Sequence, residues 1–210
     1  MNHPATVIVL AAGHANRFTG VGHKLAQALD GSDDAGKVLS VTLRNAIASR
    51  LPVLVVTHAE LAPLAHQQVA ARDVVILPPT RRGGVGDSIA AGVSARADAS
   101  GWVLLPADMP RVRPTTLQLV ANALQTHAVA YAQYRGLRGH PVGFSAELFS
   151  ELVALTGDEG ARRLVARYPA QAVEVDDPGV LIDIDTVQDL AKLRSVHGGS
   201  ATPVADLRRH

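Results

Sequence analysis

The sequence TVIVLAAG at residues 6–13 decides the fold. Its first five residues are apolar or β-branched, as in a strand that is buried on both faces of a parallel sheet. Three small residues, Ala11, Ala12 and Gly13, then follow where the strand passes into a loop. Ligands bind beyond the carboxyl ends of the strands in open α/β sheets. The stretch therefore predicts the type of sheet and the edge that carries a site.

Similar apolar runs recur along the first two thirds of the chain, and segments with helical spacing separate them. The predicted strands are residues 6–10, 53–56, 74–77 and 103–105, and the predicted helices are residues 38–47, 61–69, 88–95 and 116–124. Alternation of strand and helix is typical of a mainly parallel sheet that is covered by helices on both faces, with right-handed crossovers.

The pattern becomes more irregular after residue 124. Strands are predicted at residues 129–134, 141–144 and 172–175, with helices at residues 146–155 and 161–166 between them. We expect this half to form a second lobe of the same site. A last helix should begin at Thr186, whose hydroxyl suits an N-cap, and should end near Leu193.

Composition favours one domain, which we place at residues 1–196. The chain has 210 residues, of which 47% are hydrophobic and 19% charged, enough for one α/β core. It has no cysteine, which excludes disulfides and thiolate metal sites. The formal charge of +1 indicates neither nucleic acid nor a membrane as a partner. Residues 1–4 do not open a signal segment, so we expect a cytoplasmic protein, and residues 197–210 are predicted to be a disordered tail.

The loop after the first strand is predicted to bind phosphates. Small residues allow backbone N–H groups to approach a phosphate chain, and Arg17 and Lys24 supply positive charge. The alternative is an ordinary turn with two solvated cations. The loop has no Gly-Lys-Ser/Thr sequence and lacks the later glycines of a dinucleotide fingerprint, which disfavours a Walker-type site and a hydride-transfer enzyme.

A second glycine-rich loop opens the helix predicted at residues 88–95. Its sequence PPTRRGGVGDSI at residues 78–89 lets Asp87 or Ser88 cap the helix, and the preceding amides would then be free to contact a base or ribose. A capped glycine loop with a purely structural role remains open.

Acidic residues follow two other apolar runs. Asp108 stands just after the strand at residues 103–105, and Asp183 and Asp185 precede the last helix. Alternation should place both late aspartates on one side of an extended segment, with Ile184 on the other. One of them would share a hard cation with Asp108, because oxygen ligands suit Mg²⁺. Helix caps and turn formers are the alternative reading of all three.

The segment GLRGHPVGF at residues 136–144 is predicted to be a turn between two strands. Its cation Arg138 and imidazole His140 are candidates for gripping an acceptor, although a histidine of this kind also serves as a structural residue. The other eight histidines show no metal-ligand spacing.

In this order, five segments resemble the molybdenum cofactor nucleotidyltransferases, and the cytidylyltransferase branch more than the guanylyltransferase branch. They are LAAG at 10–13 with Arg17, Phe18, Lys24 and Leu25; GVGDSIAAG at 84–92; Asp108-Met109-Pro110; RGHPVGF at 138–144; and GDEGAR at 157–162 with DIDT at 183–186. The resemblance implies a Rossmann-like, three-layer α/β/α nucleotidyltransferase fold, as in the nucleotide-diphospho-sugar transferases. It also implies transfer of NMP, in this branch CMP, from an NTP to the terminal phosphate of molybdopterin, with release of pyrophosphate.

The same resemblance assigns roles to particular residues. It implies catalytic roles for Arg17, Lys24 and Asp108, and Mg²⁺ ligation by Asp108 and Asp185. The implied nucleotide-binding residues are Leu10, Ala11, Ala12, Gly13, Arg17, Lys24, Gly86, Ser88 and Asp108. The implied acceptor-binding residues are Arg138, Gly139, His140 and Pro141.

Three departures from the family pattern stand out. Ala15 replaces a Gly or Ser, the acidic segment 30–36 is a longer insertion that we expect to be a flexible flap, and Val187-Gln188 replaces Pro-Glu. Rival functions are a guanylyltransferase using GTP, a transferase acting on a sugar or alditol phosphate, and a non-catalytic module that binds the nucleotide or cofactor. A recipient molybdoenzyme is a further expected partner.

Overall fold

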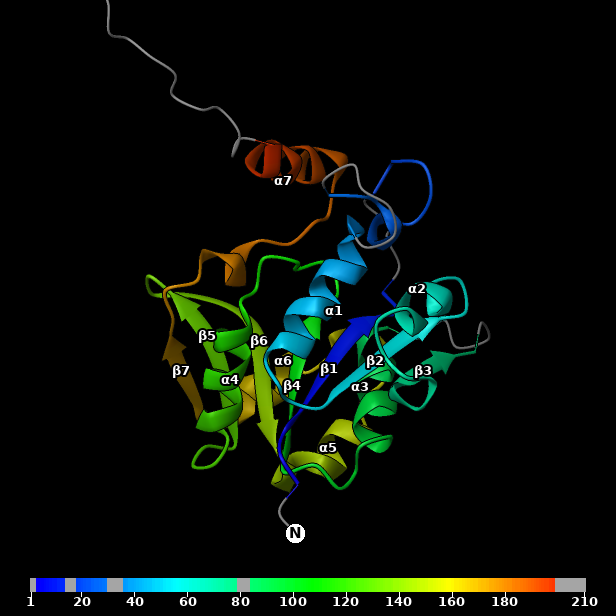
Figure 1. Ribbon diagram of the computed structural model, residues 1–210. Coiled ribbons are helices and arrows are strands. Elements are labelled where there is room, and N and C mark those ends of the chain that lie inside the picture. The colour runs from blue at the N-terminus through cyan, green and yellow to red at the C-terminus, as the bar shows by residue number, and fades with distance from the viewer. Residues whose placement is uncertain (1–2, 14–17, 30–35, 79–83, 199–210) are drawn as a thin grey trace, which may run out of the picture.

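The computed structural model describes residues 3–13, 18–29, 36–78 and 84–198 (Figure 1). Within them, seven strands form one sheet in the order β3-β2-β1-β4-β6-β5-β7. Their bounds are β1 Thr6–Ala11, β2 Val53–His58, β3 Val74–Leu77, β4 Gly101–Pro106, β5 Val129–Tyr134, β6 Leu137–Ser145 and β7 Ala170–Glu174.

Strand direction confirms the mainly parallel sheet. β1 runs parallel to β2 and β4, β2 to β3, and β5 to β7, whereas β6 is antiparallel to both β4 and β5. The expectation of a second lobe is wrong, because β6 pairs directly with β4 and continues the same sheet. The antiparallel β6 starts at the edge where β1 and β4 end, which brings both halves of the chain to that edge.

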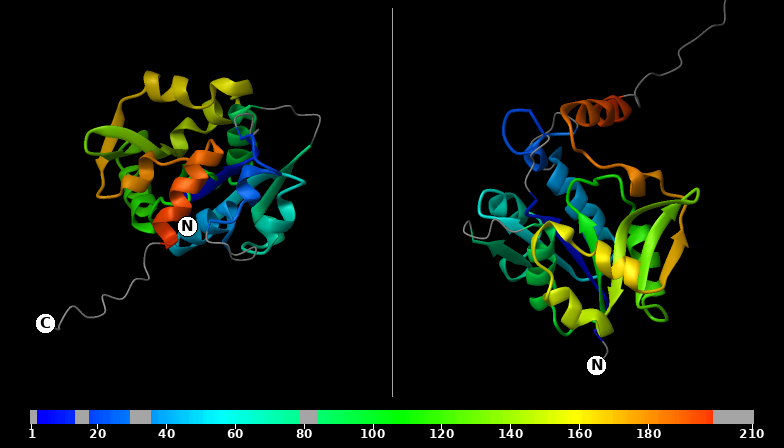
Figure 2. Two further views of the ribbon diagram at one scale, coloured as in Figure 1. Left: turned by 90° about the horizontal axis from the view of Figure 1, so that it is seen from above. Right: turned by 180° about the vertical axis from the view of Figure 1, so that it is seen from behind.

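Helices cover both faces of the sheet, as predicted (Figures 1 and 2). Those on one face are α1 Val38–Ala48, α2 Ala62–His66 and α4 Pro114–Ala123; those on the other are α3 Val85–Ser94, α5 Phe149–Val153 and α6 Arg162–Arg167. The last helix, α7, spans Val187–Gly198. Short 3₁₀ turns are η1 Lys24–Ala26, η3 Ala71–Asp73, η4 Ala146–Leu148, η5 Gly157–Glu159 and η6 Pro178–Leu181.

Alternate side chains of β1 hold the two helical layers to the sheet. Val7 and Val9 belong to the apolar core shared with α1 and α4, whereas Ile8 packs into the core beneath α3. All three are fully buried. Each such side chain contributes about 1.5–3 kcal/mol of burial free energy, which explains why a short run fixes the centre of the fold. Within the described part of the chain, no helix combines the length and apolar character needed to span a bilayer.

The start of α7 follows the prediction. The Thr186 hydroxyl accepts a hydrogen bond from the backbone N–H of Asp189 (3.2 Å), and the Asp189 carboxylate accepts one from the backbone N–H of Thr186 (2.9 Å). Reciprocal bonds of this kind satisfy amides that the first helical turn leaves unpaired.

The predicted cap of α3 is wrong. The helix begins at Val85, and Gly84 occupies the N-cap without a side-chain cap bond. The Asp87 carboxylate instead accepts a hydrogen bond from the backbone N–H of Gly157 at 3.1 Å, and Ser88 is buried within the first turns. Asp87 therefore bonds to a loop 70 residues further along the chain and does not cap its own helix.

Five predictions fall wholly or partly on other residues. Ala15, Arg17, the insertion 30–36 apart from Gly36, residues 79–83 of the second glycine-rich loop, and the tail from residue 199 onward lie outside the described residues, whereas residues 197–198 of the predicted tail belong to α7.

Candidate functional site

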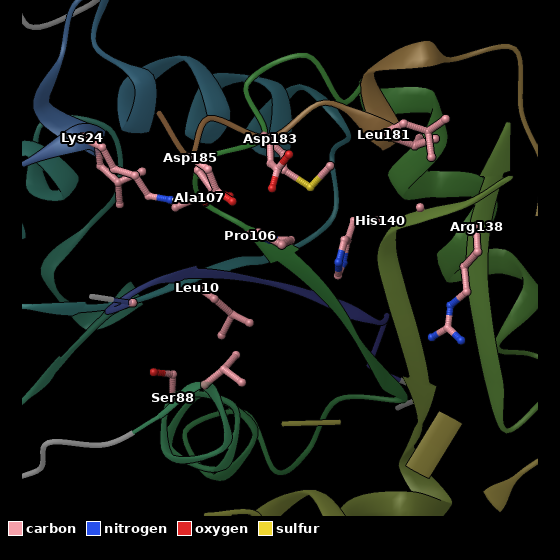
Figure 3. A pocket seen from close by; sticks show the side chains of 17 residues that line it. Leu10, Lys24, Ser88, Pro106, Ala107, Arg138, His140, Leu181, Asp183 and Asp185 are labelled. Atoms are coloured by element: carbon pink, nitrogen blue, oxygen red, sulfur yellow. Dashed lines mark hydrogen bonds and ion pairs between the residues drawn. The ribbon is translucent and has the colours of Figure 1, made fainter. Parts of the chain in front are cut away.

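A cleft of about 570 Å³ opens at the carboxyl ends of β1 and β4 (Figure 3). Its walls come from the ends of β1 and β4, η1, the start of α3, β6 and the segment before α7. The residues that line it are Leu10, Gly13, Lys24, Leu25, Val85, Ser88, Pro106, Ala107, Asp108, Met109, Arg138, Gly139, His140, Val180, Leu181, Asp183 and Asp185. The cleft lies at the edge where ligands bind in open α/β sheets.

The ammonium group of Lys24 joins two aspartates from distant parts of the chain. Lys24 Nζ lies 2.6 Å from Asp108 Oδ2 and 3.2 Å from Asp185 Oδ1. The three side chains are 12%, 18% and 23% exposed, respectively. A charge-assisted contact in such a partly buried site is stronger than one at the open surface.

The turn η1 orients Lys24. His23 Nδ1 accepts a hydrogen bond from the backbone N–H of Leu25 at 3.2 Å, and the Leu25 side chain is buried in the core. The lysine side chain therefore leaves a fixed backbone and points toward the end of β4 (Figure 3).

Neighbouring charges shift the pKa values of two groups in the cleft. Burial favours the neutral amine of Lys24, but the carboxylates of Asp108 and Asp185 outweigh burial and raise the pKa of the lysine. Partial burial and the nearby Asp185 raise the pKa of Asp183. Lys24 is thus fixed in its charged form, while negative charge is crowded around Asp183 and Asp185.

The segment 183–185 has the predicted alternation. Ile184 is fully buried, and its backbone N–H donates to the Asp108 carbonyl at 3.0 Å. Asp183 and Asp185, on either side of it, both line the cleft. This pairing explains how two acidic motifs that are far apart in sequence reach one site.

The carboxylates of the cleft supply oxygen donors of the kind that a hard cation prefers. Asp108 Oδ1 is buried and has no hydrogen-bond partner among the described residues. The described lining includes three carboxylates, of Asp108, Asp183 and Asp185, around the ammonium of Lys24. These three carboxylates are not close enough together to hold a metal ion by themselves: within the described residues, no group of three or more His, Cys, Asp or Glu side chains is placed to do so. Mg²⁺ fits this donor set, because it commonly uses one or two carboxylates and completes its shell with water and substrate phosphates.

A second cavity, of about 730 Å³, adjoins the cleft on the side of α6. Leu104, Val142 and Val165 give it apolar walls, and Arg138 and Arg162 add guanidinium groups. The residues shared with the cleft are Leu10, Val85, Pro106, Arg138, Gly139 and His140.

Arg138 and His140 lie on β6 itself, which corrects the prediction of a turn at this place. The turn is formed by Arg135 and Gly136, both with positive φ. The Arg138 guanidinium stacks 4.7 Å from the centre of the Tyr131 ring. His140 lines both cavities, and burial by the surrounding protein lowers the pKa of its imidazole despite the nearby Asp108 carboxylate.

Nine of the predicted site residues line the cleft: Leu10, Gly13, Lys24, Ser88, Asp108, Arg138, Gly139, His140 and Asp185. Ala11, Ala12, Gly86 and Pro141 are not among the residues that line either cavity. Arg17 lies outside the described residues. The lining residue Arg162 had no assigned role, although it ends the sequence GDEGAR that contributed to the resemblance.

Gly13 and Gly86 differ in what lies beside their Cα atoms. A Cβ at Gly86 would lie 2.9 Å from the backbone of Thr156 and Gly157, so Gly86 is needed for the packing of that loop on α3. A Cβ at Gly13 would meet no atom of the described residues within 4 Å, and Gly13 lines the cleft.

The doubly covered sheet and the charged cleft at its carboxyl edge define a Rossmann-like α/β/α protein of the nucleotidyltransferase type. The model of one protein family, described as the MobA-like NTP transferase domain, matches residues 7–173. The chain therefore belongs to the MobA-like NTP transferase family and is a nucleotidyltransferase of that kind.

Curated relatives and solved structures extend the comparison. The chain is 34% identical to the purine catabolism protein PucB of Bacillus subtilis, over 89% of this chain and 94% of the relative. It is 32% identical to a phosphoenolpyruvate guanylyltransferase of Mycolicibacterium vanbaalenii, over 80% and 79% of the two chains. Rv0371c of Mycobacterium tuberculosis in complex with manganese superposes with a TM-score of 0.72 and 26% identity, covering 93% of this chain and 100% of that one.

Proposed function

We propose that the protein transfers CMP from CTP to the terminal phosphate of molybdopterin, with Mg²⁺, and releases pyrophosphate. One observation carries the proposal: Lys24 contacts both Asp108 and Asp185 in a cleft that continues into a second cavity with guanidinium groups. The cleft offers groups for phosphates and a cation, and the cavity offers room for an acceptor.

Asp108 and Asp185 would hold Mg²⁺, whose chemistry there is to neutralise the charge of the triphosphate and of the leaving pyrophosphate. The buried Oδ1 atom of Asp108 supports this assignment, because a carboxylate oxygen without a partner is costly unless a cation or water reaches it. The manganese bound by the similar Rv0371c agrees with use of a divalent ion.

The residues of the chain would position the two substrates and neutralise the charge on their phosphates. An oxygen of the acceptor phosphate attacks the α-phosphorus of CTP, the new P–O bond forms, and the bond to the β-phosphate breaks with the electron pair leaving on pyrophosphate. The acceptor phosphate is already anionic at neutral pH, so this step requires no strong base. Lys24 would turn from the carboxylates to the phosphates, where its charge stabilises the leaving group.

The size of the second cavity favours a large acceptor. At about 730 Å³ it has far more room than a three-carbon phosphate ester such as phosphoenolpyruvate fills. Its apolar walls suit the faces of a ring system, and Arg138 suits the phosphate end, because a guanidinium binds phosphate oxygens in pairs. Guanylyl transfer to phosphoenolpyruvate is the second candidate, since the relative from Mycolicibacterium carries that name.

The test is a matrix of CTP, GTP, ATP and UTP against molybdopterin and phosphoenolpyruvate, with Mg²⁺. Pyrophosphate release gives the rate and mass spectrometry identifies the product. We expect a cytidine dinucleotide of molybdopterin, and no product from the Asp108→Asn variant. A guanosine product of phosphoenolpyruvate would replace the proposal with the second candidate. Nucleotide binding without pyrophosphate release in every combination would indicate a binding module.

A further inference from the structure

Two side chains of α1 hold the loop that carries Asp108. The Thr42 hydroxyl donates to the backbone carbonyl of Ala107 at 2.8 Å, and the Asn45 amide donates to the carbonyl of Pro110 at 2.9 Å. Thr42 and Asn45 are one helical turn apart and grip the loop on both sides of Asp108. Neither residue is among those that line the cleft.

The backbone of the same loop is held from two other directions. The Ala107 N–H donates to the carbonyl of Leu10 at 3.1 Å, and the Asp108 carbonyl accepts from the N–H of Ile184 at 3.0 Å. The loop therefore joins the end of β1, the segment that carries Asp185, and α1. Of the described bonds to the backbone of this loop, those from α1 are made by side chains, so substitution can remove them.

The contact of Thr42 is buried. Thr42 is 1% exposed, and its hydroxyl also lies 3.0 Å from the Val38 carbonyl within α1. A threonine hydroxyl has one proton, and the shorter distance is the one to Ala107. If that donor is removed, a buried carbonyl next to Asp108 loses its partner, which favours a shift of the loop.

We infer that Thr42 and Asn45 are positioning residues that set the place of the Asp108 carboxylate for nucleotidyl transfer. The inference rests on the proposed function. The Lys24–Asp108 contact is short, and the reacting groups must meet within a fraction of an ångström, so a small displacement of the loop lowers the rate without removing any group from the cleft.

The experiment compares Thr42→Val, Thr42→Ser and Asn45→Ala in the full chain. Two controls remove similar bonds away from the cleft: Ser49→Ala loses a buried hydroxyl that donates to the Ala46 carbonyl at the C-cap of α1, and Gln118→Ala loses an amide that donates to the Ser49 carbonyl. The readouts are kcat, KM for the NTP, the Tm, and hydrogen–deuterium exchange of residues 106–112.

Thr42→Val and Asn45→Ala should lower kcat by about 10- to 100-fold, while KM for the NTP changes less than about threefold. Amide exchange in residues 106–112 should become faster, because the Ala107 amide donates to the Leu10 carbonyl and the Met109 amide to the Pro106 carbonyl, and a shift of the loop weakens both bonds. Thr42→Ser should restore kcat and the protection. The controls should lower the Tm by a similar few degrees and leave both kcat and the exchange of this loop unchanged.

Unchanged exchange of residues 106–112 in Thr42→Val would overturn the inference, and so would faster exchange with unchanged kcat. Loss of kcat in the controls to the same extent would also overturn it, since the effect would then follow general stability. If wild-type protein turns over no NTP, the proposed function fails, and with it the catalytic part of the inference. The exchange data still decide whether α1 holds the loop.

Discussion

Apart from the residues they share, the cleft and the cavity beside it are lined by different kinds of side chain. In the cleft an ammonium group contacts carboxylates, and Lys24 Nζ lies 2.6 Å from Asp108 Oδ2. The cavity has mostly aliphatic walls, and its charged side chains are Arg162, Asp158 and Arg138, of which Arg138 also lines the cleft. Paired charges suit a step in which phosphate charge moves, whereas apolar walls with a few charged groups suit recognition. The contrast suggests that transfer chemistry and acceptor choice are separable.

Replacing Asp108 should have the largest effect. Asp108→Asn keeps the shape of the side chain but removes the charge that would hold a cation and pair with Lys24. We expect turnover to fall by at least about 1,000-fold with little change in Tm, measured by pyrophosphate release and by thermal unfolding. The matched control is Asp98→Asn, whose side chain is 66% exposed near His3. A fully active Asp108→Asn protein would remove the metal assignment.

Replacing Lys24 should give nearly as large a loss of turnover but the opposite effect on cation binding. Lys24→Met removes a positive charge that stabilises the leaving group, so we expect a loss of about 100- to 1,000-fold. The same ammonium competes for Asp108 and Asp185, so Mn²⁺ without nucleotide should bind the variant more tightly than wild type, as measured by electron paramagnetic resonance. The surface variant Lys192→Met is the control. Weaker Mn²⁺ binding by Lys24→Met would contradict the idea that this lysine occupies the place of the cation.

Replacing Arg162 tests the cavity alone, because Arg162 lines the cavity and is not among the residues that line the cleft. Arg162→Ala should raise KM for the acceptor by about 10- to 100-fold, the range for loss of a hydrogen bond to a charged group. KM for the NTP should stay unchanged. Arg167→Ala, which removes an ion pair with Glu151 on the surface, serves as control. Equal changes in both KM values would show that the two regions are not separable.

The smallest effect concerns pH and His140. Burial lowers the pKa of this imidazole from its usual 6.5, so the folded protein takes up the proton less readily than the unfolded chain. Below the usual pKa the unfolded chain binds the proton first, and the contribution of His140 to stability is lost as the pH falls. His140→Gln should therefore show a slightly smaller drop in Tm between about pH 7.5 and pH 5.5 than wild type. An identical drop in both proteins would mean that His140 is not desolvated in the fold.

Much of the sheet was predictable because its strands are coded by short apolar runs. Residues 6–10 and 129–134 were placed almost at the observed bounds of β1 and β5, and Thr186 caps α7 as predicted. The structure brings Asp108, after β4, and Asp185, between η6 and α7, to the same Lys24 ammonium. Their role as metal ligands stays a prediction.

What was missed depends on contacts between distant segments. The start of α3 was misplaced because Gly84 and Gly86 leave room for the loop at residues 156–157, and Asp87 bonds to that loop instead of capping. The place of Arg162 depends on how α6 packs beneath the sheet. Likewise, nothing in the local sequence of α1 marks Thr42 as a partner of the Asp108 loop. The spacing of apolar residues predicts the structure of one segment at a time, and it carries no information about which distant residues will contact one another.

The reversed direction of β6 has a consequence for how this architecture diversifies. Because β6 begins at the edge where β1 and β4 end, a single hairpin of β5 and β6 delivers Arg138, Gly139 and His140 to both cavities. A hairpin is a compact unit with its own turn. If the proposed function holds, exchanging residues 137–140 between relatives would change this part of the acceptor wall without altering Lys24, Asp108 or Asp185, whereas Val142 and Phe144 further along β6 belong to the buried core.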